Sequence, residues 1–178
     1  QTSGTKNVAI GYTLTDLSVS SVELQISSDG GLTWTVPTTS ATGDVGGVVS
    51  PGSGKSITWN AGTDFNNQDS SSMKVRLRPT DAYGNAGSFT TSGAFSVDTT
   101  APSVSNVTAS QNAGAGTVTI HYDISDTNTS TVGIDISEDG GTTWGVATTT
   151  LSGDVGAGLT SGTGKTVSWT ASTDFPNR

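Results

Sequence analysis

The stretch Ser27-Ser28-Asp29-Gly30-Gly31-Leu32-Thr33-Trp34 returns 110 residues later as Ser137-Glu138-Asp139-Gly140-Gly141-Thr142-Thr143-Trp144. Aligned at this offset without a gap, residues 1–68 and 111–178 share 31 identities in 68 positions. Self-similarity at a fixed period is the signature of a repeat architecture. The chain therefore contains a tandem repeat, and we predict two domains, 1–99 and 100–178.

Both copies of this stretch have the composition of a tight turn between strands. The Asp side chain can accept hydrogen bonds from nearby N–H groups, and the Gly-Gly pair tolerates positive φ. Apolar residues alternate on both sides of the first copy, namely Val22, Leu24 and Ile26 before it and Trp34 and Val36 after it. The pattern predicts a β-hairpin tip. We expect the tryptophan at its root to pack against the sheet, with a platform for sugar rings as the alternative.

The same positions, in the pattern Ser-x-Asp-x-Gly-x-Thr-Trp, resemble the Asp-box of sialidase-like β-propellers and other extracellular β proteins. In that family the box is a structural hairpin away from the catalytic centre. The resemblance implies a structural role for Ser27, Asp29, Gly31, Thr33, Trp34, Ser137, Asp139, Gly141, Thr143 and Trp144. A sialidase is not expected, because propeller blades recur at roughly 40–50 residues and the chain offers no set of active-site arginines.

Period-two alternation of apolar residues predicts an all-β fold. Strands are expected at 7–14, 21–27, 55–59 and 72–78, followed by a last strand marked by Phe89, Phe95 and Val97. No segment shows the 3.6-residue apolar stripe of an amphipathic helix. Roughly seven short strands per repeat predict a two-sheet sandwich, with Trp59 and Trp169 in its core.

The end of the first repeat resembles the Ig-like or fibronectin type III-like repeats of bacterial surface proteins and adhesins. The resemblance rests on a strand at 73–78, the motif Asp81-x-x-Gly84-Asn85, a further strand and the junction Val97-Asp98-Thr99-Thr100-Ala101-Pro102. It implies tandem β-sandwich domains at the cell surface that act as stalks, spacers, filament-forming segments or adhesive modules. Repeats of this kind are often stiffened by calcium at their junctions.

Alignment of the two repeats leaves both incomplete. The first lacks the counterpart of 101–110, its first strand, and the second lacks the counterpart of 69–100, which includes its last two strands. Either the sequence is a window from a longer array, or another copy of the chain supplies the missing strands by strand addition. Without those strands, a sandwich would expose its core and a long sheet edge.

Composition restricts the class of partner. The net charge of −8 and the pI near 4.2 argue against nucleic acid, which requires a basic face. The absence of cysteine excludes disulfides, thiol catalysis and zinc–thiolate sites. No continuous apolar stretch is long enough for membrane insertion. Low charge with abundant Ser, Thr and Gly fits an extracellular protein of a bacterium or archaeon.

Two clusters are candidate binding sites. Asp81, Asn85, Asp98 and Asp126 could supply oxygen ligands to a calcium ion at the domain junction. Lys74, Arg76 and Arg78 lie on one face of the predicted 72–78 strand and form a candidate site for an anionic glycan. The alternative for these three residues is cross-strand pairing with acids such as Glu23.

Other motifs are expected to be structural. The stretches 52–56 and 162–166 end in Gly-Lys-Ser or Gly-Lys-Thr, as a phosphate-binding P-loop does, but they lack its first glycine and precede a strand instead of a helix. His121 is the only histidine, which rules out a histidine-rich metal site, and its alternation with Ile120 and Tyr122 predicts a solvent-exposed strand residue. We therefore expect a non-enzymatic structural or adhesive module. The alternative is a carbohydrate-binding accessory module of a secreted enzyme, for which only Tyr83 is a plainly spare aromatic residue.

Overall fold

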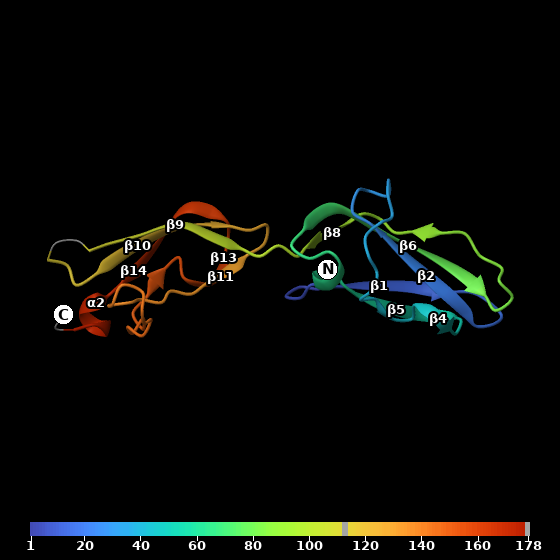
Figure 1. The fold of residues 1–178 in the computed structure, drawn as a ribbon, viewed down its shortest axis with the longest axis horizontal. Coiled ribbons are helices and arrows are strands. Elements are labelled where there is room, and N and C mark those ends of the chain that lie inside the picture. Colours follow the sequence, from blue (N-terminus) through green and yellow to red (C-terminus); the bar gives the residue numbers. More distant parts are fainter. Residues whose placement is uncertain (112–113, 177–178) are drawn as a thin grey trace. The chain divides into compact units, whose positions relative to one another are not determined.

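The computed structural model describes residues 1–111 and 114–176 of the chain (Figure 1). The chain divides into two compact units, Gln1–Thr100 and Ala101–Arg178. This boundary lies one residue from the predicted one. Nearly all regular structure in both units is antiparallel β-strand, so the predicted all-β class is confirmed.

The first unit consists of two antiparallel sheets. One has the order β1-β5-β3, and the other has the order β4-β2-β6-β7 with β8 also paired to β6. The strands are β1 (Asn7–Leu14), β2 (Ser20–Ser27), β3 (Thr42–Gly43), β4 (Gly46–Val49), β5 (Gly52–Asn60), β6 (Asp69–Asp81), β7 (Thr90–Thr91) and β8 (Phe95–Asp98).

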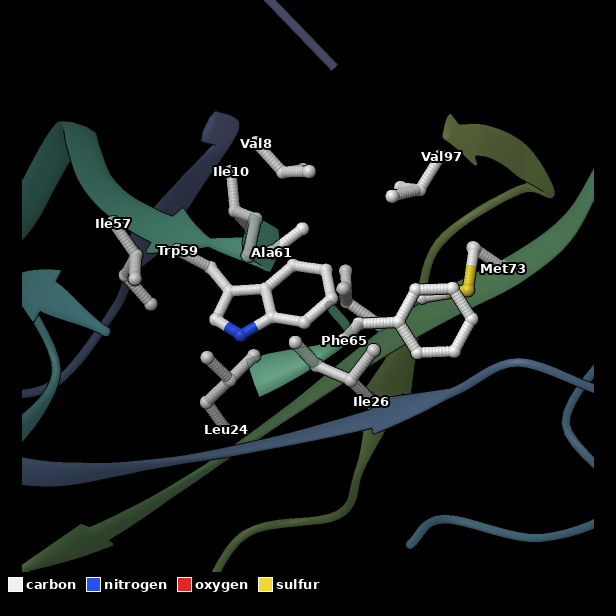
Figure 2. Packing of buried hydrophobic residues seen from close by; sticks show 11 residues of the cluster. Val8, Ile10, Leu24, Ile26, Ile57, Trp59, Ala61, Phe65, Met73 and Val97 are labelled. Carbon is white, nitrogen blue, oxygen red and sulfur yellow. The ribbon is translucent and has the colours of Figure 1, made fainter. Parts of the chain in front are cut away.

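The core of the first unit receives side chains from both sheets. Figure 2 shows the indole of Trp59 in the middle of this cluster, between Ile10 and Ala61 on one side and Leu24 and Ile26 on the other. Trp59 and Ile26 are fully buried, with 0% of their surface exposed. The inward positions are those of the period-two alternation, because successive side chains of a strand point to opposite faces.

The second unit repeats this plan in part. A four-stranded sheet has the order β12-β14-β10-β9, and a two-stranded sheet pairs β11 with β13. The strands are β9 (Ser103–Gln111), β10 (Val118–Ser125), β11 (Ser130–Val132), β12 (Ser152–Gly153), β13 (Gly156–Leu159) and β14 (Gly162–Trp169). Its core contains Ile120, Tyr122, Ile124, Val167 and Trp169.

Among the described residues, each unit has one single-turn helix. α1 (Ala61–Asp64) follows β5, and α2 (Ala171–Asp174) follows β14. In the described part of the chain, neither helix has the length or the apolar character needed to span a membrane.

Three local predictions are corrected. The expected hairpin after residue 27 has no second strand, because the returning chain pairs with β2 only through the isolated bridge between Ile26 and Val36. The glycine-rich stretch 42–47, expected to be irregular, contributes β3 and part of β4. The expected last strand is split into β7 and β8. Each of these segments is too short to show an apolar period of its own.

Candidate functional site

The Asp-box positions form the same hydrogen-bonded turn in both units. The Asp29 carboxylate accepts hydrogen bonds from the Ser27 hydroxyl at 2.7 Å and from the Thr33 amide and hydroxyl at 2.9 and 2.6 Å. The backbone around them turns through Gly30 and Gly31, at φ 80° and 95°. These are left-handed conformations that glycine adopts without strain.

The second copy repeats these bonds. Asp139 accepts hydrogen bonds from the Ser137 hydroxyl at 2.8 Å and from the Thr143 amide and hydroxyl at 2.8 and 2.7 Å. The bonds from Thr143 lower the pKa of Asp139 to about 2, and the bond from the Thr33 hydroxyl lowers the pKa of Asp29 in the same direction. A carboxylate held ionised in this way closes a turn and is a poor general acid or base near neutral pH.

The tryptophans of the two copies have different environments. Trp34 is half-buried, and the Arg76 guanidinium carbon lies 4.2 Å from the centroid of its ring. Trp144 is 62% exposed. The difference follows from β6, which carries Arg76 in the first unit and has no counterpart among the described residues of the second.

The basic residues of β6 are engaged on the outer face of their sheet. Arg78 donates two hydrogen bonds to Glu23 on β2, at 2.9 and 2.6 Å, and Arg76 donates two to Gln25, at 2.9 and 2.6 Å. The guanidinium carbon of Arg76 also lies 4.1 Å from the centroid of the Phe89 ring. The predicted cross-strand pair with Glu23 is therefore present. Lys74, the third residue of the candidate glycan face, is opposite Ser27 in the β2–β6 ladder.

The four predicted calcium ligands do not gather at one place. Asp81 is opposite Ser20 at one end of the 13-residue strand β6, whereas Asp98 is opposite Asp69 at the other end. At roughly 3.3 Å per residue, the two carboxylates lie about 40 Å apart along the strand and cannot bind the same ion. Among residues 1–111 and 114–176, no group of three or more His, Cys, Asp or Glu side chains is placed to hold a metal ion.

Each of these carboxylates has hydrogen-bond donors within its own loop. Asp81 accepts from the amides of Tyr83 and Asn85 and from the Asn85 side chain, and the bond from that side chain is the main cause of its lowered pKa. Asp98 accepts from the Thr100 amide at 2.8 Å. Asp126, in the second unit, accepts from the Ser130 hydroxyl at 2.9 Å. Calcium binding by any of the four residues stays a prediction.

One group of hydrogen bonds that occurs in both units was not predicted from the sequence. The Asp64 carboxylate accepts from the Trp59 indole N–H at 2.9 Å and from the Ser40 hydroxyl at 2.7 Å, and so joins α1 to β5 and to the loop before β3. Asp174 does the same with Trp169 and Thr150, at 2.9 and 2.8 Å. The signal was present in the sequence as a tryptophan followed five residues later by an aspartate in both repeats.

Asp174 makes the second unit acid-sensitive. The hydrogen bond from the Thr149 hydroxyl is the main cause that lowers its pKa to about 2, desolvation opposes the shift, and bonds from Thr150 add to it. An unfolded Asp has a pKa of about 3.9. The folded state is therefore stabilised above about pH 4, and this stabilisation is lost as the pH falls toward 2.

We expect Asp174→Asn to lower the melting temperature of the second unit at pH 6. The difference between wild type and variant should shrink steadily below about pH 4, because the unfolded chain takes up the proton first. Calorimetry between pH 6 and pH 2 measures this difference. A difference that stays constant over the whole range would contradict the assignment.

The motifs that resemble a P-loop lie in strands. Residues 52–56 and 162–166 begin β5 and β14, and Lys55 lies 3.8 Å from the Asp44 carboxylate. Each motif continues directly as a strand, so no helix N-terminus lies next to it that could bind a phosphate. His121 is exposed on β10, and its Nδ1 lies 3.1 Å from the Thr166 hydroxyl.

The first unit has an apolar groove of about 480 Å³ between its two sheets. It is lined mainly by residues 10–15 of β1 and the following turn, by Val75 and Leu77 of β6 and by residues 90–92. The lining contains no Asp, Glu, His, Lys or Arg, and therefore offers no strong acid–base pair. In the second unit the corresponding strand, β10, is paired with β9 along its edge.

Comparison of the chain with protein-family models, with curated proteins and with solved structures gave no match. The geometry of the two units is therefore the basis for a functional proposal.

Proposed function

We propose that the chain is a non-enzymatic structural or adhesive repeat module of an extracellular surface protein. The observation that carries the proposal is that the same structural hydrogen bonds occur in both units. The carboxylates that recur in both units, with Asp29 and Asp139 or Asp64 and Asp174 as examples, bind the same kinds of backbone and hydroxyl groups in each. Residues that recur because they close turns are expected in a repeat that serves as a structural connector.

The strand order supports an immunoglobulin-like or fibronectin type III-like assignment. In the immunoglobulin sandwich one sheet has the strands A, B, E and D, and the other has C, F and G with C′ beside C in some members. The sheet β9-β10-β14-β12 of the second unit follows the order A-B-E-D. The order β4-β2-β6 of the first unit matches C′-C-F in space, and β8, paired to β6, takes the place of G. Along the chain the strand in the D place, β3, precedes the strand in the C′ place, β4, which is the reverse of the immunoglobulin connection.

Composition supports an extracellular location and a role in arrays. The chain has no cysteine, a net charge of −8 and 24 glycines, as expected for a surface domain of a bacterium or archaeon that is stable without disulfides. Neighbouring repeats of the same protein, or other copies of the chain, are the proposed partners.

A carbohydrate-binding accessory module is the second candidate. Two exposed aromatic side chains favour it, because Tyr83 is 87% exposed and Trp144 is 62% exposed. Exposed aromatic rings can stack on the apolar faces of sugars. The two residues belong to different units, Tyr83 to the first and Trp144 to the second.

A glycan array separates the two candidates. For a structural module we expect no saturable binding to neutral or acidic glycans. Saturable binding that is lost in Tyr83→Ala or Trp144→Ala would establish the carbohydrate-binding function. Saturable binding of acidic glycans that is lost when Lys74, Arg76 and Arg78 are all replaced by serine would establish the basic face as a site.

Force spectroscopy completes the test, because a stalk domain of 100 residues should unfold with a gain in contour length of roughly 330–360 Å.

A further inference from the structure

Two tripeptides of the form Asn-x-Ser/Thr occur in the chain, and both lie in the second unit. They are Asn106-Val107-Thr108 and Asn128-Thr129-Ser130. This tripeptide is the acceptor motif for N-linked glycosylation of exported proteins. In a chain rich in serine and threonine the tripeptide alone is a weak signal, so its structural surroundings decide whether it can carry a saccharide.

Asn106 lies at a β-bulge in the strand β9, which is exposed along its whole length (Figure 1). In the ladder with β10, Thr108 is opposite His121 and Ser105 is opposite Asp123. Two residues of β9 therefore face a single residue of β10 between these pairs. Asn106 has φ 53°, a left-handed conformation that asparagine adopts more readily than most residues. A bulge of this kind changes the direction in which a side chain points.

The amide and the hydroxyl of the first tripeptide lie on the same face of the sheet. Asn106 Nδ2 donates a hydrogen bond to Asp123 Oδ2 at 2.7 Å. Asp123 stands between two core residues of β10, so its side chain is on the outer face of the sheet. Thr108 is opposite His121, which is exposed on that same face. Both groups that define the motif are therefore presented to solvent, away from the core.

The carboxylate that holds Asn106 is itself fixed. Asp123 Oδ1 accepts a hydrogen bond from the Gly164 amide at 2.7 Å. The bond from the Asn106 side chain is the main cause that lowers the pKa of Asp123, and the bond from Gly164 adds to it. The carboxylate therefore stays ionised near neutral pH and keeps the Asn106 side chain on the outer face.

The bond to Asp123 is compatible with addition of a sugar. An asparagine side-chain nitrogen carries two protons, and the bond to Asp123 uses one of them. In the transfer, Nδ2 forms a bond to C1 of the first sugar of a saccharide that is linked through phosphate to a polyprenol. The bond between C1 and the phosphate oxygen breaks, the phosphate leaves with the electron pair, and one proton leaves Nδ2. The remaining N–H still donates to Asp123.

The second tripeptide is presented differently. Asn128 is exposed, but Ser130, the third residue of the motif, is only 6% exposed. The Ser130 hydroxyl donates a hydrogen bond to Asp126 at 2.9 Å. Because the motif requires a hydroxyl at its third position, the folded unit presents only the tripeptide at Asn106 in full.

We propose that Asn106 is an acceptor for an N-linked saccharide, transferred from a polyprenyl phosphate donor when the chain is exported. The saccharide extends into solvent from the outer face of the sheet that contains β9 and β10. The inference rests on the proposed function in one respect, which is that the chain crosses a membrane that holds the transferase.

Secretion of the full chain from a host that performs N-linked glycosylation tests the proposal. An export signal is added before Gln1, and an Asn-x-Thr tripeptide in an unstructured tail after Arg178 reports that the transferase has reached the chain. Intact mass is measured before and after treatment with a peptide N-glycosidase, which converts a glycosylated asparagine to aspartate and so locates the site in peptide mass spectra. We expect a saccharide on Asn106 in most molecules whose tail is modified.

Thr108→Ala and Thr108→Ser are the matched variants, because both leave Asn106 and its bond to Asp123 in place. The first should abolish the modification of Asn106, and the second should retain it. An unmodified Asn106 in molecules with a modified tail, or a saccharide on Asn128 alone, would overturn the proposal. A modification of Asn106 that persists in Thr108→Ala would overturn it as well. The glycan array and force spectroscopy measure other properties of the chain, so the proposed function and this inference can fail separately.

Discussion

Trp59→Ala is expected to lower the free energy of unfolding of the first unit by roughly 3–5 kcal/mol, the usual cost of removing a large buried aromatic side chain. Trp59 is 0% exposed and lies at the centre of the core. The substitution leaves a cavity between the sheets and also removes the indole donor that binds Asp64 at 2.9 Å. Urea denaturation followed by circular dichroism measures the loss.

Trp169→Ala is the matched control in the second unit. Its indole makes the equivalent hydrogen bond to Asp174 at 2.9 Å, and the residue is 6% exposed. This variant should destabilise the second unit and leave hydrogen-exchange protection in the first unchanged. A loss of less than about 1 kcal/mol for Trp59→Ala would show that the core closes around the missing side chain.

Gly43→Ala is expected to destabilise the first unit by roughly 2–4 kcal/mol, because left-handed backbone strain and an overpacked contact add together. Gly43 has φ 98°, and a Cβ atom there would lie 2.5 Å from the carbonyl oxygen of Ser56. That oxygen belongs to β5, with which β3 pairs, so the clash cannot be relieved by the movement of a side chain.

Gly46→Ala separates the two causes. Gly46 also has a positive φ, 73°, but a Cβ atom there would meet no heavy atom within 4 Å. We expect about 1–2 kcal/mol for this variant, the cost of the left-handed conformation alone. Urea denaturation of both variants gives the comparison. Equal losses would mean that the contact with Ser56 contributes nothing.

Much of the fold could be predicted because the alternation of the longer strands is local. The predicted strands at 7–14, 21–27, 55–59 and 72–78 all fall within β1, β2, β5 and β6. The inward positions of these strands and the tight turns can both be predicted from residues that are close together in the sequence. The short strands β3 and β4 were missed, because their hydrogen bonds come from distant strands that they pair with.

The candidate sites were harder to predict. Asp81 and Asp98 both lie near the end of the first repeat in the sequence, which suggested a shared calcium site at the domain junction. The structure separates them because Asp98 pairs with Asp69 at the start of the 13-residue strand β6, whereas Asp81 is the last residue of that strand. In a β fold, the distance between two side chains depends on which strand each residue pairs with.

The sequence by itself determined the repeat, the all-β class, the two Asp-box turns and the inward positions of the long strands. All of these follow from neighbouring residues, through side-chain periodicity and the backbone preferences of Asp and Gly. Only the tertiary structure decided that Trp34 is covered by Arg76 while Trp144 is open, and that residues 20–27 form eight residues of strand where residues 130–137 form three. The physical reason is that a turn is closed by its own residues, so the two closely similar turns fold alike. A β-strand takes its hydrogen bonds and its cover from another segment, so similar strands differ when their partners differ.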